Sequence, residues 1–70
     1  MDFKKVAERI RELRHESGLS AVKLGKEVGL SDGAIINWEN GKRVPTIEVI
    51  YKLSKFFNVT SDYLLGLKDD

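Results

Sequence analysis

The sequence predicts an all-α fold, a compact bundle of five helices in which residues 1–70 form a single domain. Apolar residues recur at helical spacing in successive segments, and a Ser or Thr suited to begin a helix precedes four of the five. No stretch alternates polar and apolar residues for long enough to indicate a strand. The chain has no cysteine, so packing between helices, rather than disulfides or a thiolate zinc site, must stabilise it.

The first helix is expected over residues 3–17. Its apolar residues fall at helical spacing and indicate a single buried face: Phe3, Val6, Ala7, Ile10 and Leu13. Charged residues, Arg9 among them, occupy the other faces. Gly18 follows in the position where glycine most often ends a helix.

Ser20 is expected to cap a second helix that extends to about Val28. Leu24 and Val28 are four residues apart, so they lie on one face and are expected to point into the core. Gly25 destabilises a helix by roughly 1 kcal/mol relative to alanine. Its presence there indicates a close approach between this helix and another.

A third helix is expected to begin after the cap Ser31 and to bury Ile35 and Trp38. Gly29 separates it from the second helix. Two helices of about two turns each, joined by about three residues that include a glycine, are typical of a helix-turn-helix motif. In such a motif, placed here at residues 20–39, the second helix can enter a DNA major groove.

The segment 40–45 is a polar loop that contains the only proline. Thr46 is expected to cap a fourth helix that ends near Asn58 and whose core-facing residues are Ile47, Ile50, Leu53 and Phe57. Thr60 is expected to cap a short fifth helix that Gly66 ends, and residues 67–70 are expected to form a polar tail.

Composition restricts the classes of function. The net charge of +1 does not by itself indicate a nucleic-acid binder. The charged N-terminus has no apolar signal segment, and no apolar run approaches the roughly 18 to 20 residues of a membrane span, so we expect a cytoplasmic protein. His15 is the only histidine, it is expected to be solvated, and no catalytic set or metal-ligand cluster accompanies it. We therefore expect no enzyme activity, cofactor or bound metal.

Several segments together resemble the Cro and lambda-repressor-like (XRE-type) family of bacterial and phage transcriptional regulators. They are G-L-S at 18–20, L-G-K-E-V-G-L-S at 24–31, I-I-N-W-E-N-G-K-R at 35–43, P-T at 45–46 and V-T-S-D-Y-L-L-G at 59–66. The resemblance implies a five-helix domain that binds operator DNA as a dimer, most often as a repressor on a palindromic site. The partner is then double-stranded DNA, within a bacterium or a phage-infected cell.

The resemblance also implies residue roles. Positions that read base edges in the family correspond here to Asp32, Gly33, Ile36 and Asn37. Asn37 has the most suitable side chain, because an amide can pair bidentately with adenine N6 and N7. Ile36 is suited to contact a thymine methyl group or a protein partner.

Phosphate contacts are expected at two places, the start of the second helix and the loop after the third: Ser20, Ala21, Lys23, Asn40, Gly41, Lys42 and Arg43. In the loop, glycine lets backbone N–H groups approach a phosphate, and the two cations release counterions from DNA.

Two further roles are structural. Residues that match Arg14 and Glu39 pair across the first and third helices in the family, which implies an ion pair here. The fifth helix and its flank carry more apolar residues than one short helix can bury, so they are the expected dimer surface: Phe57, Tyr63, Leu64, Leu65 and Leu67.

One alternative function remains open. Ala21, Asp32, Gly33 and Ile36 replace residue types that the family often uses to hold phosphates or read bases. A protein-interaction module on the same fold, antitoxin-like or able to bind a protein regulator, would tolerate these four residues. The loop sequence N-G-K-R favours DNA binding instead.

Overall fold

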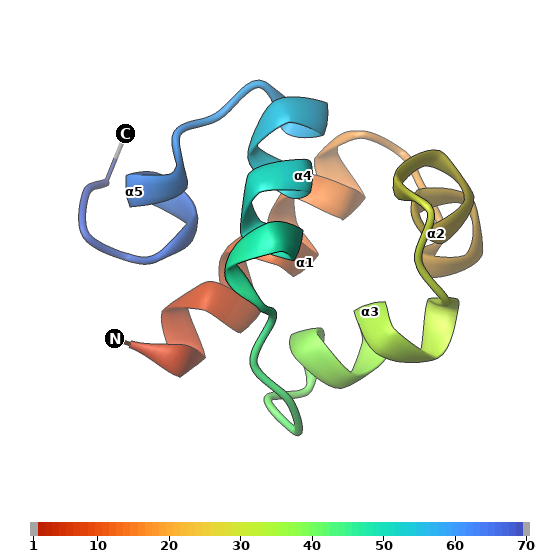
Figure 1. Ribbon diagram of the computed structural model, residues 1–70, viewed down its shortest axis with the longest axis horizontal. Helices are drawn as coiled ribbons and strands as arrows, with labels where there is room; N and C mark the ends of the chain where they lie inside the picture. The colour runs from red at the N-terminus through yellow and green to blue at the C-terminus, as the bar shows by residue number, and fades with distance from the viewer. Residues whose placement is uncertain (1, 70) are drawn as a thin grey trace.

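The computed structural model describes residues 2–69, and all regular structure within that range is helical (Figure 1). The five helices are α1 (Phe3–Glu16), α2 (Ala21–Val28), α3 (Asp32–Glu39), α4 (Ile47–Phe57) and α5 (Ser61–Leu64). The all-α, five-helix prediction is therefore confirmed.

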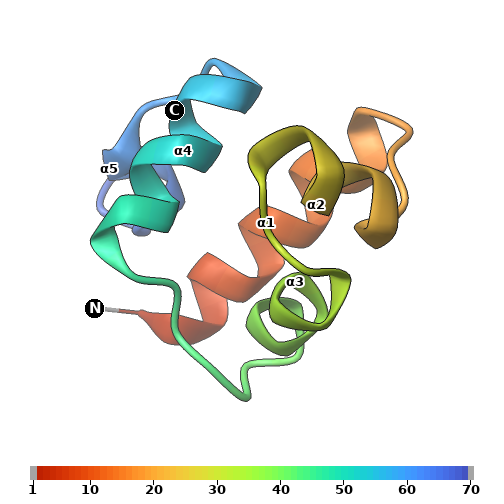
Figure 2. The ribbon, with the colours of Figure 1, turned by 45° about the vertical axis from the view of Figure 1, so that its right-hand side comes forward.

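One hydrophobic core holds the five helices together. α2 and α3 lie on one side of the molecule and α4 and α5 on the other, while α1 packs against both α3 and α5 (Figure 2). Every helix contributes to the buried cluster, which consists of Val6, Ile10, Leu24, Ile35, Trp38, Val49, Ile50, Leu53 and Leu64. The core thus fixes α2 and α3 relative to the rest of the chain.

Each helix begins at a residue whose side chain accepts a hydrogen bond from the backbone N–H three positions later. The four predicted caps, at Ser20, Ser31, Thr46 and Thr60, have this geometry. Asp2 caps α1 in the same way, through a bond of 3.0 Å from the Lys5 N–H. An Asp before an amphipathic segment is a favoured cap, so the sequence held a signal for it.

Gly25 is closely packed, and its neighbours are the turn after α2 and the first residue of α3. A Cβ atom at this position would overlap the carbonyl oxygen of Leu30 and lie 3.4 Å from the backbone nitrogen of Asp32. The Leu30 N–H in turn donates to the Gly25 carbonyl at 2.7 Å. Gly25 therefore lets the turn fold directly onto α2, and this sets how α3 leaves it.

Two predicted core residues lie at the surface. Ile47 is 88% exposed and Phe3 is 55% exposed. Ile47 is the first residue of α4 and Phe3 the first of α1, so both lie beyond the edge of the core. Val49 takes the buried position in the first turn of α4.

Arg9 and the C-terminal segment also differ from expectation. The Arg9 side chain is buried, and its guanidinium donates to the carbonyl oxygens of Tyr63 and Lys68, the latter at 2.6 Å. It also donates to the Asp69 carboxylate at 3.1 Å and lies 4.2 Å from the centre of the Tyr63 ring. Lys68 and Asp69 of the expected polar tail are therefore held against α1, and Asp70 lies outside the described residues.

Candidate nucleic-acid interface

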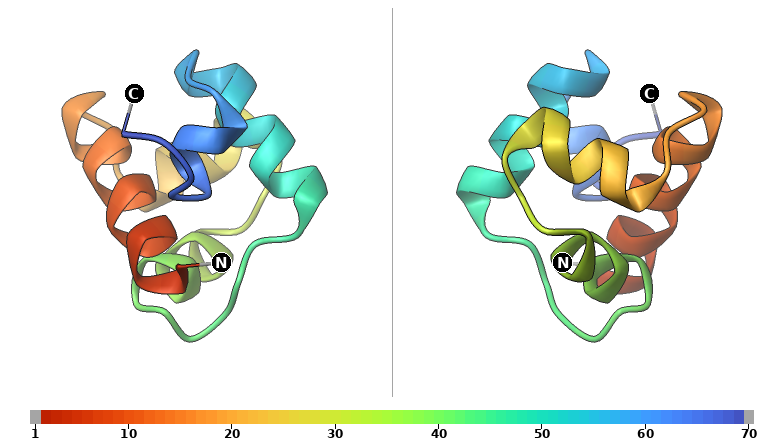
Figure 3. Two further views of the ribbon diagram at one scale, coloured as in Figure 1. Left: turned by 90° about the vertical axis from the view of Figure 1, so that its left-hand side faces the viewer. Right: turned by 90° about the vertical axis from the view of Figure 1, so that its right-hand side faces the viewer.

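The base-reading prediction falls on the outer side of α3. Asp32, Gly33 and Ile36 are exposed, and Asn37 is half-buried. Ile35 and Trp38 of the same helix are buried in the core, so they orient the four residues outward. α2 lies across α3, and the chain that follows α3 projects at the edge of the molecule (Figure 3).

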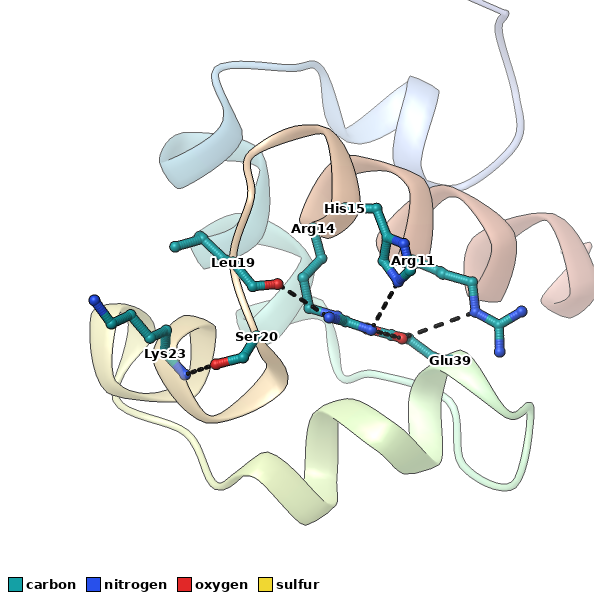
Figure 4. Close-up of polar contacts among 7 residues, drawn as sticks. All are labelled: Arg11, Arg14, His15, Leu19, Ser20, Lys23 and Glu39. Carbon is teal, nitrogen blue, oxygen red and sulfur yellow. Dashed lines mark hydrogen bonds and ion pairs between the residues drawn. The ribbon is translucent and has the colours of Figure 1, made fainter.

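The start of α2 is the first predicted phosphate site. The Ser20 hydroxyl accepts a hydrogen bond of 3.1 Å from the Lys23 backbone N–H (Figure 4). Ser20 and Lys23 are exposed, whereas Ala21 is half-buried and packs against the core. This helix end combines a positive dipole end with the Lys23 cation, an arrangement that favours an anion.

The second predicted phosphate site is the turn after α3, where residues 40–43 are all exposed. Their backbone N–H groups, however, donate within the chain. Asn40 donates to Ile36 at 2.9 Å and Gly41 to Trp38 at 3.2 Å, while Lys42 and Arg43 donate to the Asn37 carbonyl at 2.9 and 3.3 Å. Glycine was expected to let these N–H groups approach a phosphate, and in this structure all four have an acceptor within the chain. The Lys42 and Arg43 side chains provide the positive charge of this turn.

Arg14 and Glu39 form a two-bond contact between α1 and the end of α3 (Figure 4). Arg14 Nε lies 2.6 Å from Glu39 Oε2, and Arg14 Nη2 lies 2.8 Å from Glu39 Oε1. Arg14 Nη1 also donates to the Leu19 carbonyl at 3.0 Å. The hydrogen bonds to Glu39 raise the pKa of Arg14, and the Glu39 charge adds to this effect. The pair fixes the end of α3 on α1.

Two residues beside this pair were not predicted to take part. Arg11 Nε lies 4.0 Å from Glu39 Oε1. His15 Nε2 lies 3.2 Å from Arg14 Nη2. His15 is exposed, as expected, but it has a specific neighbour.

The predicted dimer surface is partly wrong. Leu64 is fully buried in the core of its own chain, so it is unavailable to a partner. Phe57, Tyr63 and Leu65 are half-buried, and Leu67 is 69% exposed.

An apolar groove of about 460 Å³ lies between α4 and α5, and the sequence did not reveal it. It is lined by Pro45, Ile47, Ile50, Tyr51, Ser54, Ser61 and Leu65. Its most exposed hydrophobic residues, Ile47 and Tyr51, lie on α4, where periodicity alone had assigned Ile47 to the core.

Residues 2–69 contain no group of three or more His, Asp or Glu side chains placed to hold a metal ion. In the same range, we find no helix with the length and apolarity needed to cross a membrane.

Comparison with known proteins identifies the family. The profile of a helix-turn-helix family matches residues 10–64, most of the chain. The chain belongs to this helix-turn-helix family, the Cro and lambda-repressor-like regulators.

Relatives of this helix-turn-helix chain have names that refer to transcription. It is 40% identical over 59 residues to the HTH-type transcriptional activator BcrR of Enterococcus faecalis, covering 84% of this chain and 29% of that protein. It is 38% identical over 65 residues to the repressor protein C2 of Salmonella phage P22, covering 93% of this chain and 30% of that protein. The chain therefore spans less than a third of the length of either relative.

A solved structure supports the same assignment. The helix-turn-helix chain matches the P22 c2 repressor, crystallised with synthetic operator 9T in the presence of Tl⁺, with a TM-score of 0.79 and 39% identity. The match covers 84% of this chain and 89% of that one.

Proposed function

We propose that this chain is a sequence-specific DNA-binding module of a transcriptional regulator. The observation that carries the proposal is the exposed outer side of α3, next to a turn that presents Lys42 and Arg43. An α-helix with its side chains is about 10–12 Å in diameter, and the major groove of B-DNA is about 12 Å wide. The helix can thus lie in the groove while the turn and the start of α2 meet phosphates on either side.

Within this arrangement, the four outer residues of α3 take different roles. Asn37 pairs with adenine, Ile36 contacts a thymine methyl group, and Asp32 accepts from cytosine N4. Gly33 has no side chain and leaves space for a base edge. Ser20, Ala21 and Lys23 position the chain on one phosphate, which carries little sequence information.

Support for DNA over a protein-interaction role comes from the relatives. The C2 relative is a repressor by name, and the solved structure of the c2 repressor contains a synthetic operator. BcrR is named an activator, so the two relatives regulate in opposite directions. We infer repression for this chain because the match to the repressor covers more of its length. Such a regulator acts in the cytoplasm of a bacterium or phage-infected cell, where its operator lies.

We further propose that two copies bind a palindromic operator, with half-sites about one helical turn apart. The corrected dimer surface consists of Leu65, Leu67, Ile47 and Tyr51, which border or extend the groove between α4 and α5. The groove begins at Pro45, two residues after the cation pair. A second copy placed there would lie next to the turn that meets the DNA backbone.

A salt titration with a duplex of random sequence tests the proposal. A DNA-binding domain loses affinity steeply, with log K falling by about 0.9 for each phosphate neutralised per tenfold rise in salt. Selection of bound sequences from a random duplex library then supplies the operator. Absence of binding at about 50 mM salt would instead favour the protein-interaction module, since non-specific DNA binding is strongest at low salt.

Two substitutions separate the roles of the reading helix and the turn. Asn37→Ala should relax the preference at one or two base pairs, at a cost of about 1–3 kcal/mol for the preferred base. Arg43→Ala should weaken binding to all sequences alike and lower the salt slope by about one. Binding to a panel of single-base operator variants measures both, with melting temperatures as the control for folding. An unchanged base preference in Asn37→Ala would contradict its reading role.

A further inference from the structure

The turn after α3 is closed by a specific pair of hydrogen bonds. Gly41 has a φ of +74° and donates to the Trp38 carbonyl at 3.2 Å, and Lys42 donates to the Asn37 carbonyl at 2.9 Å. These are the two bonds of a Schellman motif, which ends helices at a residue in the left-handed conformation. Arg43 adds a third bond, also to the Asn37 carbonyl, at 3.3 Å.

One consequence concerns what the turn can offer to DNA. The backbone N–H groups of residues 40–43 already have acceptors within the chain. The exposed side chains of Lys42 and Arg43 are therefore the groups left to meet a phosphate. The backbone N–H groups of Lys42 and Arg43 also share a single acceptor, the Asn37 carbonyl. The side chain of Asn37 itself lies on the proposed reading face.

We propose that Gly41 is a positioning residue for DNA binding. This inference rests on the proposed function. Its left-handed turn ties Lys42 and Arg43 to the Asn37 carbonyl, and so fixes the two cations relative to α3. The phosphate contacts of this turn are made by side chains and not by the backbone. Gly41 itself touches no phosphate and acts only through the two residues that follow it.

The chain contains a matched control for this turn. Gly18 ends α1 with a φ of +70° and the same pair of bonds, from Gly18 to His15 at 3.0 Å and from Leu19 to Arg14 at 3.1 Å. An added Cβ atom meets nothing within 4 Å at either glycine. A side chain therefore introduces backbone strain at both positions without a clash, but only Gly41 precedes the two cations.

The experiment measures the salt slope of binding to a random duplex for the wild type and four variants. In Gly41→Val, a β-branched residue cannot hold this φ, so the turn opens and the slope falls by about 1 to 2. Gly41→Asn keeps the slope, because Asn tolerates the left-handed conformation, as Asn58 does in this chain at a φ of +56°. Gly18→Val loses thermal stability but keeps the slope. In the double variant Lys42→Gln, Arg43→Gln, the salt slope falls by about 1.8, which corresponds to two phosphates at about 0.9 each.

The outcomes separate this inference from the proposed function. If the wild type shows no salt-dependent binding, the proposed function fails and this inference fails with it. If the wild type binds but folded Gly41→Val keeps its slope, only the positioning role is overturned. Should Gly41→Val fail to fold, the double variant decides, because an unchanged slope there would show that the two cations do not meet phosphates and would overturn the inference.

Discussion

Gly25 and Gly33 lie in neighbouring helices but have different surroundings. A Cβ at Gly25 would overlap the Leu30 carbonyl oxygen, whereas one at Gly33 meets nothing within 4 Å. We expect Gly25→Ala to destabilise the chain by about 1–3 kcal/mol, because the turn must move. Gly33→Ala should stabilise it by about 0.5–1 kcal/mol, since alanine loses less conformational entropy in a helix. Urea denaturation of both variants measures these changes, and equal effects would contradict the packing described for Gly25.

The pair between Arg14 and Glu39 is the most buried ion pair that carries a residue of α3. The Arg14 side chain is 16% exposed and that of Glu39 only 5%. Arg14→Met or Glu39→Met should each cost about 3 kcal/mol, since each leaves a buried charge without its partner. The double variant Arg14→Met, Glu39→Met should lie closer to the wild type than either single variant. Thermal denaturation of the three variants checks this, and additive losses would argue against a direct interaction.

The pH dependence of that pair follows from the raised pKa of Arg14, caused by its hydrogen bonds to Glu39. A raised pKa means that the folded state holds the proton more tightly than the unfolded state. The stabilisation is therefore complete below the unfolded pKa, and it is lost only as the pH rises through the folded value in strong alkali. The stability cost of Arg14→Met should accordingly stay constant from mildly acidic to mildly alkaline pH.

At the scale of elements, the buried Arg9 side chain joins α1 to the segment after α5. Arg9 reaches the Lys68 carbonyl and the Asp69 carboxylate, while half-buried Lys5 lies 3.6 Å from the same carboxylate. Arg9→Met should cost about 2 kcal/mol, because several charge-assisted hydrogen bonds are lost. Lys5→Met, the control, should cost less than about 0.5 kcal/mol, as for other surface pairs.

Hydrogen exchange reports whether the loss of Arg9 is local. The Leu67 and Lys68 amides both donate to the Asp62 carbonyl, at 2.8 and 3.3 Å. In Arg9→Met these two amides should exchange faster, while the amides of α2 and α3 keep their protection. Uniform loss of protection would mean that Arg9 supports the whole core and not the terminal segment alone.

The helices themselves could be predicted because their signals are local. Ser20, Ser31 and Thr46 each specify a helix start through a bond to a residue three positions away, and this requires no knowledge of the fold. Ile47 and Arg9 were misplaced for the opposite reason. The exposure of Ile47 depends on how far the core extends along α4, and that of Arg9 depends on where α5 meets α1. The periodicity of the sequence predicts neither.

For the candidate site, the sequence predicted the position of α3 but not the geometry of the turn that follows it. The spacing of caps and core residues placed α3, and therefore which of its residues face outward. The sequence could not predict the acceptors of the backbone N–H groups after α3, because these depend on the conformation of the turn at Gly41. The groove between α4 and α5 is likewise a property of two packed helices and not of either sequence segment.

At the scale of the whole molecule, the proposed dimer surface can be tested without disturbing the fold. Ile47 is 88% exposed, so Ile47→Glu should change the stability of the monomer by no more than about 0.5 kcal/mol. It should also prevent two copies from binding a selected operator together, because a carboxylate would enter the apolar groove. Val22→Gln, an uncharged polar substitution at an aliphatic residue 50% exposed on α2, is the control and should leave the number of bound copies unchanged.

Sedimentation of the protein with a selected operator counts the copies bound. Two cooperative copies of Ile47→Glu on one operator would contradict the assigned surface and point to another face of the molecule. A wild type that protects only one half-site would contradict dimeric binding altogether.

The Arg9 contacts also bear on the order of folding. They join residues up to 60 positions apart, so closing this loop costs more entropy than forming the neighbouring α2 and α3 contacts. We expect contacts of this kind to form after the transition state of folding, in which case their loss acts mainly on the unfolding rate. Arg9→Met should therefore unfold faster while refolding at the wild-type rate, as followed by the fluorescence of buried Trp38. One side chain would then set how long the native fold persists without setting how quickly it forms.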